Sequence, residues 1–393
     1  MSDMTPEDEK NLEPELTSEP EPAAEPVVKK ARQWVTLRGS SMDLRVGQGI
    51  VGEVAHDLRS IIGRPHACAL LHAPDADARA LEDLRRDLCD QGFEVHVYEM
   101  PSGEESLVLA SVEKVAAFLA DSGVTSDDLV VAMGHAPELS VAAFACQHWC
   151  GGVPLAIVPC DLVSALTAGV TPRWLSVDGH ERMVSQDGSA RFEVCDLALF
   201  DLDPNGEDYR LARSIMVATA MADVEKSVSE LWDRSEALLA GDLDALIDQI
   251  VLTVRGRGKI VASTSVAVRQ SIDYGRTFGF ALKSLVGDAE PDSVLLADGM
   301  RFAARVSAAS ESLTIDDMFT QDELLERLGI PTSKTQVDPE ALLEAVRAER
   351  FARTNRFMLE IPRALGRVRL SNVEIDLLRE HVSAWCAARG QEA

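Results

Sequence analysis

A glycine-rich segment near the start of the chain has the spacing of a nucleotide-binding loop. Residues 47–52 read Gly-Gln-Gly-Ile-Val-Gly, follow a strand-like stretch at 42–46, and precede Asp75 by about 23 residues. In nucleotide-binding α/β proteins such glycines let backbone amides at a helix N-terminus approach a pyrophosphate. Glycines are also common at tight strand-to-helix turns without any ligand, and we favour this second interpretation because the motif stands alone.

Two cysteines and a histidine form a second candidate group. Cys146 and Cys150 are four residues apart, with His148 between them. On a helix, the cysteine spacing places soft ligands on one face, where they could hold zinc. A structural zinc site normally needs four ligands, and no second cluster of cysteine or histidine follows nearby. We therefore interpret the cysteines as buried thiols that pack within a helix.

A single histidine stands at a position where α/β proteins often bind ligands. His135 directly follows Gly134, which ends a predicted strand. A parallel sheet usually places its ligand contacts at the carboxyl ends of its strands. His135 is therefore a candidate contact, although a plain loop residue is the more common role of a lone histidine there.

These residues need a framework, and the apolar pattern predicts one. From residue 34, short apolar runs alternate with longer amphipathic stretches, which is typical of successive strands and helices. The pattern predicts strands at 34–37, 67–72, 93–98, 128–133, 153–158 and 192–199, and helices near 76–90, 104–122 and 138–149. We therefore expect an α/β N-terminal domain with a parallel sheet covered by helices on both faces.

The character of the chain changes after residues 203–206, which read Asp-Pro-Asn-Gly. Residues 208–350 carry apolar positions at helical spacing, which predicts a mostly α-helical C-terminal domain. Short strands at 357–361 and 368–370 and a helix at 372–388 complete it. Residues 1–30 carry nine acidic residues and five prolines. We expect a disordered acidic tail at 1–30, an α/β domain at 31–205 and a helical domain at 206–393.

Composition excludes several classes of protein. The formal charge of −27 opposes nucleic acid and anionic lipid surfaces, because their binding rests on Lys and Arg neutralising phosphates. No apolar run approaches the ~20 residues that span a bilayer, and the acidic N-terminus is unlike a secretory signal, so we expect a cytoplasmic location. The seven cysteines are odd in number and scattered, which predicts reduced thiols.

Several segments together resemble the 3-dehydroquinate synthase family, within the superfamily of sugar-phosphate cyclases and iron-dependent alcohol dehydrogenases. Residues 101–105 resemble the family's Pro-x-Gly-Glu turn, and residues 129–159 resemble its central strand-helix-strand. Residues 274–282, Tyr-Gly-Arg-Thr-Phe-Gly-Phe-Ala-Leu, resemble its Gly-His-Thr-Phe-Gly-His-Ala segment. Residues 299–305 resemble its Gly-Met-x-x-Ala-Ala-Arg helix, and residues 361–366 its Leu-Pro-x-x-Ile-Gly turn. Order and spacing agree from about residue 34 to 388.

The resemblance implies an NAD-binding-like α/β domain, a metal-binding-like helical domain, and a cleft between them for a seven-carbon phosphorylated sugar acid. The family's reaction is a lyase step of the shikimate pathway, in aromatic amino acid biosynthesis, and it uses NAD and zinc. The candidate catalytic residues here are Arg173 and Arg276. The positions aligned with the cofactor pocket are Gly103, Glu104, Gly134, His135 and Asp161.

The sequence departs from the family where its chemistry is most demanding. The glycine-rich cofactor loop corresponds to residues 134–140, in which Glu138 opposes phosphate. The metal ligands correspond to Val217, Arg276 and an aspartate near Asp292. A guanidinium has no lone pair to offer a metal ion. We therefore predict no metal ligands and expect neither NAD nor zinc as a cofactor.

Three functions remain open. The first is a catalytically degenerate family member that regulates an enzyme partner or homodimer, or binds a small anionic metabolite through Arg173 and Arg276. The second is a lyase or cyclase of altered mechanism that acts on a phosphorylated sugar acid. The third is an active 3-dehydroquinate synthase. If His135 and Asp161 converge with the two arginines on one pocket, the second gains support, and if the four scatter, the first does.

Overall fold

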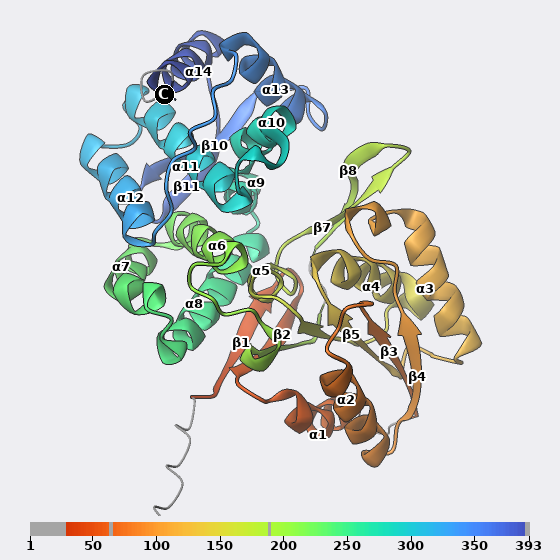
Figure 1. Cartoon of the computed structure of the whole chain (residues 1–393). Helices are drawn as coiled ribbons and strands as arrows, with labels where there is room; N and C mark the ends of the chain where they lie inside the picture. Colours follow the sequence, from red (N-terminus) through yellow and green to blue (C-terminus); the bar gives the residue numbers. More distant parts are fainter. Residues whose placement is uncertain (1–28, 63–65, 188–189, 390–393) are drawn as a thin grey trace, which may run out of the picture.

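A computed structural model describes residues 29–62, 66–187 and 190–389 of the chain. The expected disordered tail therefore lies outside the described residues, except for Lys29 and Lys30. The described chain forms an α/β N-terminal domain and a mostly helical C-terminal region, as predicted (Figure 1).

One seven-stranded sheet organises the N-terminal domain, with the strand order β1-β2-β9-β6-β5-β3-β4. The strands are β1 (Ala31–Leu37), β2 (Ser40–Gly47), β3 (Ala67–His72), β4 (Glu94–Glu99), β5 (Leu129–Gly134), β6 (Leu155–Pro159) and β9 (Phe192–Asp196). Neighbouring strands are parallel except β1 and β2, which form an antiparallel hairpin. The hairpin corrects the prediction of a wholly parallel sheet. It forms because Gly39, with φ +78°, allows a tight turn.

Strand residues alternate between two apolar cores on opposite faces of the sheet. Cys68 and Leu70 pack with α1 (Val54–Ile62) and α2 (Ala78–Asp90). Residues on the other face of the same strands pack with α3 (Leu109–Asp121), α4 (Ala136–His148), α5 (Leu162–Thr167) and the helical region. The central strands β5, β6 and β9 are buried along their whole length, as a parallel sheet between helices requires.

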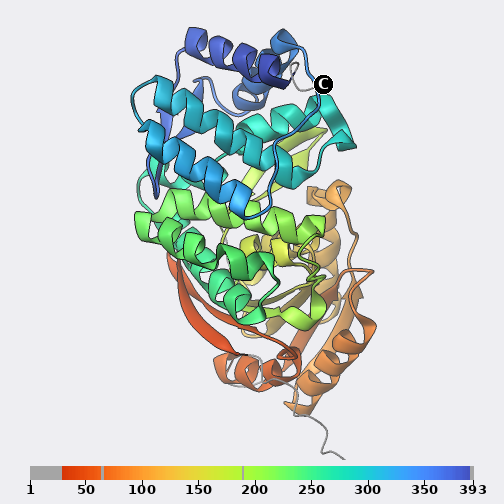
Figure 2. The same cartoon turned by 60° about the vertical axis from the view of Figure 1, so that its left-hand side comes forward.

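The helical region lies against the face that carries α5 (Figure 2). Its helices are α6 (Glu207–Asp223), α7 (Glu225–Leu239), α8 (Leu243–Ala262), α9 (Val266–Arg269), α10 (Arg276–Val286), α11 (Asp292–Ala309), α12 (Ile315–Arg327), α13 (Pro339–Phe351) and α14 (Ile375–Arg389). The predicted late strands are β10 (Met358–Ala364) and β11 (Arg367–Asn372). Because β9 ends at Asp196 and α6 begins at Glu207, the proposed domain boundary after residue 205 falls in their connection.

A second hairpin, not predicted from the sequence, leaves the α/β domain and reaches the helical region (Figure 1). It consists of β7 (Arg173–Val177) and β8 (His180–Gln186), joined at Asp178 and Gly179. Most of its residues are exposed or half-buried, and neither strand carries the continuous apolar run by which a buried strand is predicted.

Among the described residues, no helix combines the length and the apolar character that a membrane span requires.

Candidate functional site

The carboxyl ends of three neighbouring strands meet at His135. This residue follows β5 and is the N-cap of α4. Its Nδ1 atom lies 2.7 Å from Asp161 Oδ2, and its Nε2 atom lies 3.3 Å from Asp75 Oδ2. Asp161 follows β6 and Asp75 follows β3, the strands on either side of β5. The structure thus joins two of the predicted cofactor positions, His135 and Asp161.

The charge state of His135 follows from these contacts. The hydrogen bond to Asp161 raises the pKa of His135 to about 9, although partial burial acts in the opposite direction. The imidazole is therefore protonated at neutral pH, so both nitrogens donate and neither offers a lone pair. Asp161 is also occupied, because it accepts hydrogen bonds from the backbone N and the hydroxyl of Ser164 and so caps α5. This pair therefore holds the ends of β5 and β6 together.

The predicted cofactor loop is filled by the side chain of Glu138, which is 2% exposed. One carboxylate oxygen accepts from His135 N at 3.1 Å, and the other accepts from Gly103 N at 3.3 Å. Gly134 is packed closely as well, because a Cβ there would lie 3.2 Å from the Cβ of Glu138. Gly103, Gly134 and His135 therefore surround one buried carboxylate. Loss of hydration and the nearby carboxylates of Glu181 and Glu138 raise the pKa of Glu104.

This arrangement does not fit the pyrophosphate of NAD. Backbone amides that would receive a phosphate already donate to Glu138, and the adjoining Asp75 and Asp161 add negative charge. The earlier Gly-x-Gly-x-x-Gly loop is filled in the same way. There, Asp196 of β9 accepts from Gly49 N at 2.7 Å and from Val51 N at 2.9 Å. This contact supports the interpretation of residues 47–52 as a turn.

The positions aligned with the family's metal ligands do not fit a divalent ion either. Val217 is an apolar side chain buried in α6, and Asp292 lies 3.1 Å from the ammonium of Lys283. Within the described ranges, no three His, Cys, Asp or Glu side chains are grouped so that they could hold a metal. Of the candidate zinc cysteines, Cys146 is buried in α4 and Cys150 is exposed beyond its end. The second of these corrects the interpretation of both as buried thiols, because α4 ends at His148.

Arg173 lies inside the protein rather than on a cavity wall. Its side chain is buried at the start of β7, where its charge interacts with the fully buried Glu193 of β9. Burial lowers the pKa of Arg173 to about 10 and raises the pKa of Glu193 to about 8. The Nε and Nη2 atoms of Arg173 and both carboxylate oxygens of Glu193 make no hydrogen bond among the described residues. This buried pair is separate from the His135 cluster.

Arg276 lines a cavity of about 340 Å³ between the β7–β8 hairpin and the helical region. We call this cavity the arginine pocket. Its cationic residues are Arg182, Arg269, Arg276, Arg350 and Arg353. Its acidic residues are Asp187, Asp273 and Glu349. The walls also include the aromatic rings of Trp174 and Phe280. Cations therefore outnumber carboxylates on its surface.

Two arginines of this pocket stack on aromatic rings, and two have an Nε donor without a hydrogen-bond partner among the described residues. The guanidinium of Arg182 lies 4.1 Å from the ring centroid of Phe280, and that of Arg276 lies 5.9 Å from the ring centroid of Trp174. Stacking occupies the faces of a guanidinium and leaves its edge available to an anion. The Nε atoms of Arg182 and Arg350 are buried and have no hydrogen-bond partner among the described residues.

Further charge lies behind the pocket wall. Arg257 of α8 is 2% exposed and donates only to the hydroxyls of Thr171 and Thr219. Burial, with repulsion from Arg276, lowers the pKa of Arg257 to about 9. Glu360 of β10 accepts from Arg350 at 3.2 Å, and burial raises its pKa to about 7. Behind the positive wall of the pocket there is thus one buried carboxyl group, Glu360, whose pKa lies near neutrality.

The four polar groups singled out from the sequence do not converge. His135 pairs with Asp161 at the sheet edge, Arg173 is in the core, and Arg276 is in the arginine pocket. Sequence reasoning missed Arg182, and it assigned Glu349 no role in a site. Their contact joins residues 167 positions apart, and no local motif marks it. A signal for Glu138 was present, because it stands three residues after an N-cap position, as in a capping box.

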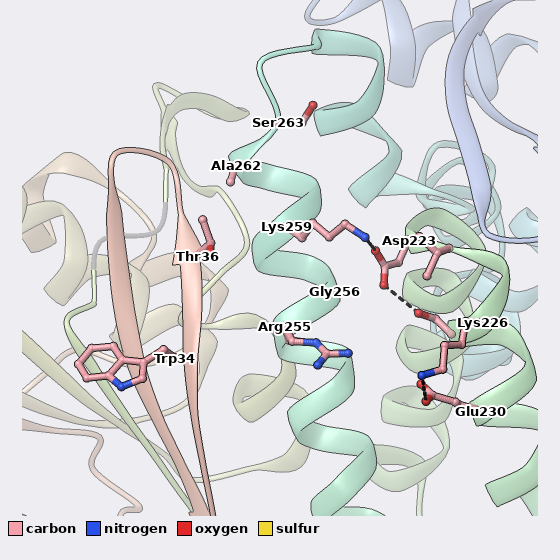
Figure 3. A pocket seen from close by; sticks show the side chains of 12 residues that line it. Trp34, Thr36, Asp223, Lys226, Glu230, Arg255, Gly256, Lys259, Ala262 and Ser263 are labelled. Carbon is pink, nitrogen blue, oxygen red and sulfur yellow. Dashed lines mark hydrogen bonds and ion pairs between the residues drawn. The ribbon is translucent and has the colours of Figure 1, made fainter.

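A second cavity, of about 450 Å³, lies between β1, α8 and the start of α7 (Figure 3). Two of its cations are paired, with Lys259 2.7 Å from Asp223 and Lys226 3.2 Å from Glu230. Arg255 has no ion pair within the part of the chain that the structure describes. None of the predicted site residues lines this cavity.

Comparison with known proteins confirms the resemblance inferred from the sequence. The chain is 25% identical over 362 residues to 3-dehydroquinate synthase of Saccharopolyspora erythraea, covering 89% of this chain and 94% of the relative. It is 24% identical over 313 residues to that of Nocardia farcinica, covering 79% and 83%. For Xylella fastidiosa, identity is 27% over 338 residues, covering 82% and 84%. No protein-family model matches the chain.

Solved structures agree on the fold. A 2-deoxy-scyllo-inosose synthase superposes with a TM-score of 0.74 at 14% identity, covering 90% of this chain and 99% of that one. The 2-epi-5-epi-valiolone synthase of Streptomyces hygroscopicus, with NAD+ and Zn2+ bound, gives a TM-score of 0.74 at 14% identity, covering 91% and 99%. The chain therefore has the 3-dehydroquinate synthase-like fold expected from its sequence.

Proposed function

We propose that this 3-dehydroquinate synthase-like protein binds a small anionic ligand in its arginine pocket and does not carry out the synthase reaction. The observation that carries this proposal is the set of five arginines around one cavity, with the buried Nε donors of Arg182 and Arg350 left without partners. A buried donor without a partner costs free energy, so an anion that accepts from it stabilises the folded protein.

The ligand is of the phosphorylated sugar acid class. Arginine's planar fork donates two parallel hydrogen bonds to a phosphate or a carboxylate, and several arginines at different walls suit a molecule that carries both groups. A volume of about 340 Å³ is at the small end of ligand cavities. Trp174 and Phe280 supply apolar contact for the carbon skeleton.

The loss of synthase chemistry is supported by the residues that replace its parts. The structure of 2-epi-5-epi-valiolone synthase described above has NAD+ and Zn2+ bound. In this chain, Glu138 accepts from the amides of His135 and Gly103, and the family resemblance places Val217 and Arg276 where the family has metal ligands. A binding or regulatory protein, acting on an enzyme partner or within a homodimer, needs neither group.

One observation favours an enzyme of altered mechanism as a second candidate. Glu360, with its pKa raised to about 7, bonds Arg350 and Thr277, both of which line the pocket. A carboxyl group that titrates near neutrality suits proton transfer. A lyase or cyclase of this kind would act on the same phosphorylated sugar acid.

Isothermal titration with inorganic phosphate and with a seven-carbon phosphorylated sugar acid tests the proposal. We expect the sugar acid to bind, and Arg276→Gln to weaken its binding about tenfold or more, because a charged hydrogen bond is lost. Arg255→Gln is the matched control, because Arg255 lines the other cavity. If both variants bind the sugar acid with the affinity of the native protein, the ligand binds outside the arginine pocket. Turnover of the sugar acid without NAD or metal would favour the enzyme candidate.

A further inference from the structure

Arg182 has an unusual backbone conformation at the edge of the arginine pocket. Its φ angle is +58°, in the left-handed region that favours glycine. In the β7–β8 pairing, Leu175 faces Val184 and Val177 faces His180, so residues 181–183 face Ser176 alone. Arg182 is therefore the centre of a β-bulge. Bulges of this kind redirect a side chain, and strained backbone is concentrated at functional positions.

The redirected side chain enters the pocket and meets a carboxylate from α13. Arg182 Nη2 donates to Glu349 Oε1 at 2.7 Å, and Arg353 Nη2 donates to the same oxygen at 2.7 Å. Only 13% of the Arg182 side chain and 16% of the Glu349 side chain are exposed. One oxygen of Glu349 is thus shared by two guanidinium groups that approach from different elements.

This contact uses only part of what Arg182 offers. Glu349 receives a single bond from Arg182, and the buried Nε of Arg182 has no partner among the described residues. A phosphate or carboxylate in line with the guanidinium edge would accept from both Nε and Nη2. The carboxylate of Glu349 therefore satisfies this position less completely than a free anion would.

We propose that Glu349 is an internal stand-in for the ligand, and that an anionic group of the ligand displaces it from Arg182 and Arg353. This inference rests on the proposed function, because it assigns the place at which one anionic group of the ligand binds. The stacking of Arg182 on Phe280 keeps the guanidinium in position while its partner is exchanged. The released Glu349 then turns toward solvent, which is near because the neighbouring Arg353 side chain is 34% exposed.

An internal competitor lowers the apparent affinity of a ligand by the fraction of protein in which the site is open. Removing the charge of Glu349 should therefore tighten binding rather than weaken it. This is the opposite of the result for a residue that supports the pocket. The sign of the effect separates the two roles.

Isothermal titration with inorganic phosphate compares the native protein with Glu349→Gln and Glu349→Ala. We expect both variants to bind phosphate about tenfold more tightly, and Arg182→Gln to bind it more weakly. Glu344→Gln is the matched control on the same helix, because Glu344 is exposed and pairs with Arg347. It should bind phosphate as the native protein does. Circular dichroism checks that each variant is folded.

The outcomes separate this inference from the proposal on which it rests. If Arg276→Gln weakens phosphate binding but folded Glu349 variants bind no more tightly than native protein, the arginine pocket stands and the stand-in role of Glu349 is wrong. If only the Glu349 variants bind phosphate, both are supported. If neither the native protein nor any variant binds phosphate, both are overturned.

Discussion

His135 Nδ1 lies 2.7 Å from Asp161 Oδ2, so that one imidazolium ring joins the end of β5 to the end of β6. That hydrogen bond is the main reason that the pKa of His135 is raised from an ordinary value of 6.5 to about 9. The negative charge of Asp75 raises it further. Because the folded-state pKa is above the unfolded value, the stabilisation is complete below about pH 6.5. It is lost as the pH rises through about 9.

We predict that His135→Gln removes this pH dependence and destabilises the protein by about 1–2 kcal/mol at pH 7. The figure is reduced from the full linkage value because 35% of the histidine side chain is exposed. Urea unfolding at pH 6, 8 and 10 measures the difference between variant and native protein. His56→Gln, at an exposed position of α1, is the control. An unchanged pH slope in His135→Gln would contradict the prediction.

NAD is expected to bind poorly, because the amides of His135 and Gly103 already donate to Glu138 and Pro137 has no amide N–H to donate. Titration of the purified protein with NAD should give no micromolar affinity. Replacing Glu138 by Gln should also cost about 1–3 kcal/mol of stability, because a buried charged acceptor of two backbone bonds is lost. Micromolar NAD binding by the native protein would contradict this prediction and show that the loop at residues 134–140 opens to accept the cofactor.

The third prediction concerns metal and activity. The aligned positions offer at most one ligand beside the fixed charge of Arg276, whereas catalytic zinc needs about three. Mass spectrometry of the purified protein should find no stoichiometric zinc, and the gene should not rescue a synthase-deficient bacterium grown without aromatic supplements. One bound zinc together with rescue would require a different alignment of the helical region.

The contact between α10 and α11 gives a stability prediction. A Cβ on Gly299 would lie 1.8 Å from the carbonyl oxygen of Gly275, which itself has φ +84°. The atoms that this Cβ would meet all belong to the backbone of Gly275, so no flexible side chain can move aside. Gly299→Ala should therefore lower the free energy of unfolding by about 3 kcal/mol or more. Gly52→Ala is the control, because its nearest neighbour is the carboxylate end of Asp87 at 3.3 Å. Thermal unfolding of the two variants makes the comparison.

The sequence predicts the sheet well because buried parallel strands leave continuous apolar runs, as residues 129–134 do. It does not predict the β7–β8 hairpin, whose half-exposed strands carry no such run. Alignment also selects Arg173 and Arg276 as a pair, yet spacing along the chain does not reveal that Arg173 turns inward toward Glu193. The role of Arg182 depends on a bulge and on residues from α10 and α13, which only the folded chain assembles.

The β7–β8 hairpin has a consequence for how the protein unfolds. The hairpin extends from the α/β domain, yet Arg182 on it bonds Glu349 of the helical region, and the arginine pocket exists only while both parts are folded and in contact. A ligand in this pocket therefore adds its binding free energy to the association of the two parts, not to either alone. At saturation they should melt together, in one transition whose midpoint rises with the logarithm of ligand concentration.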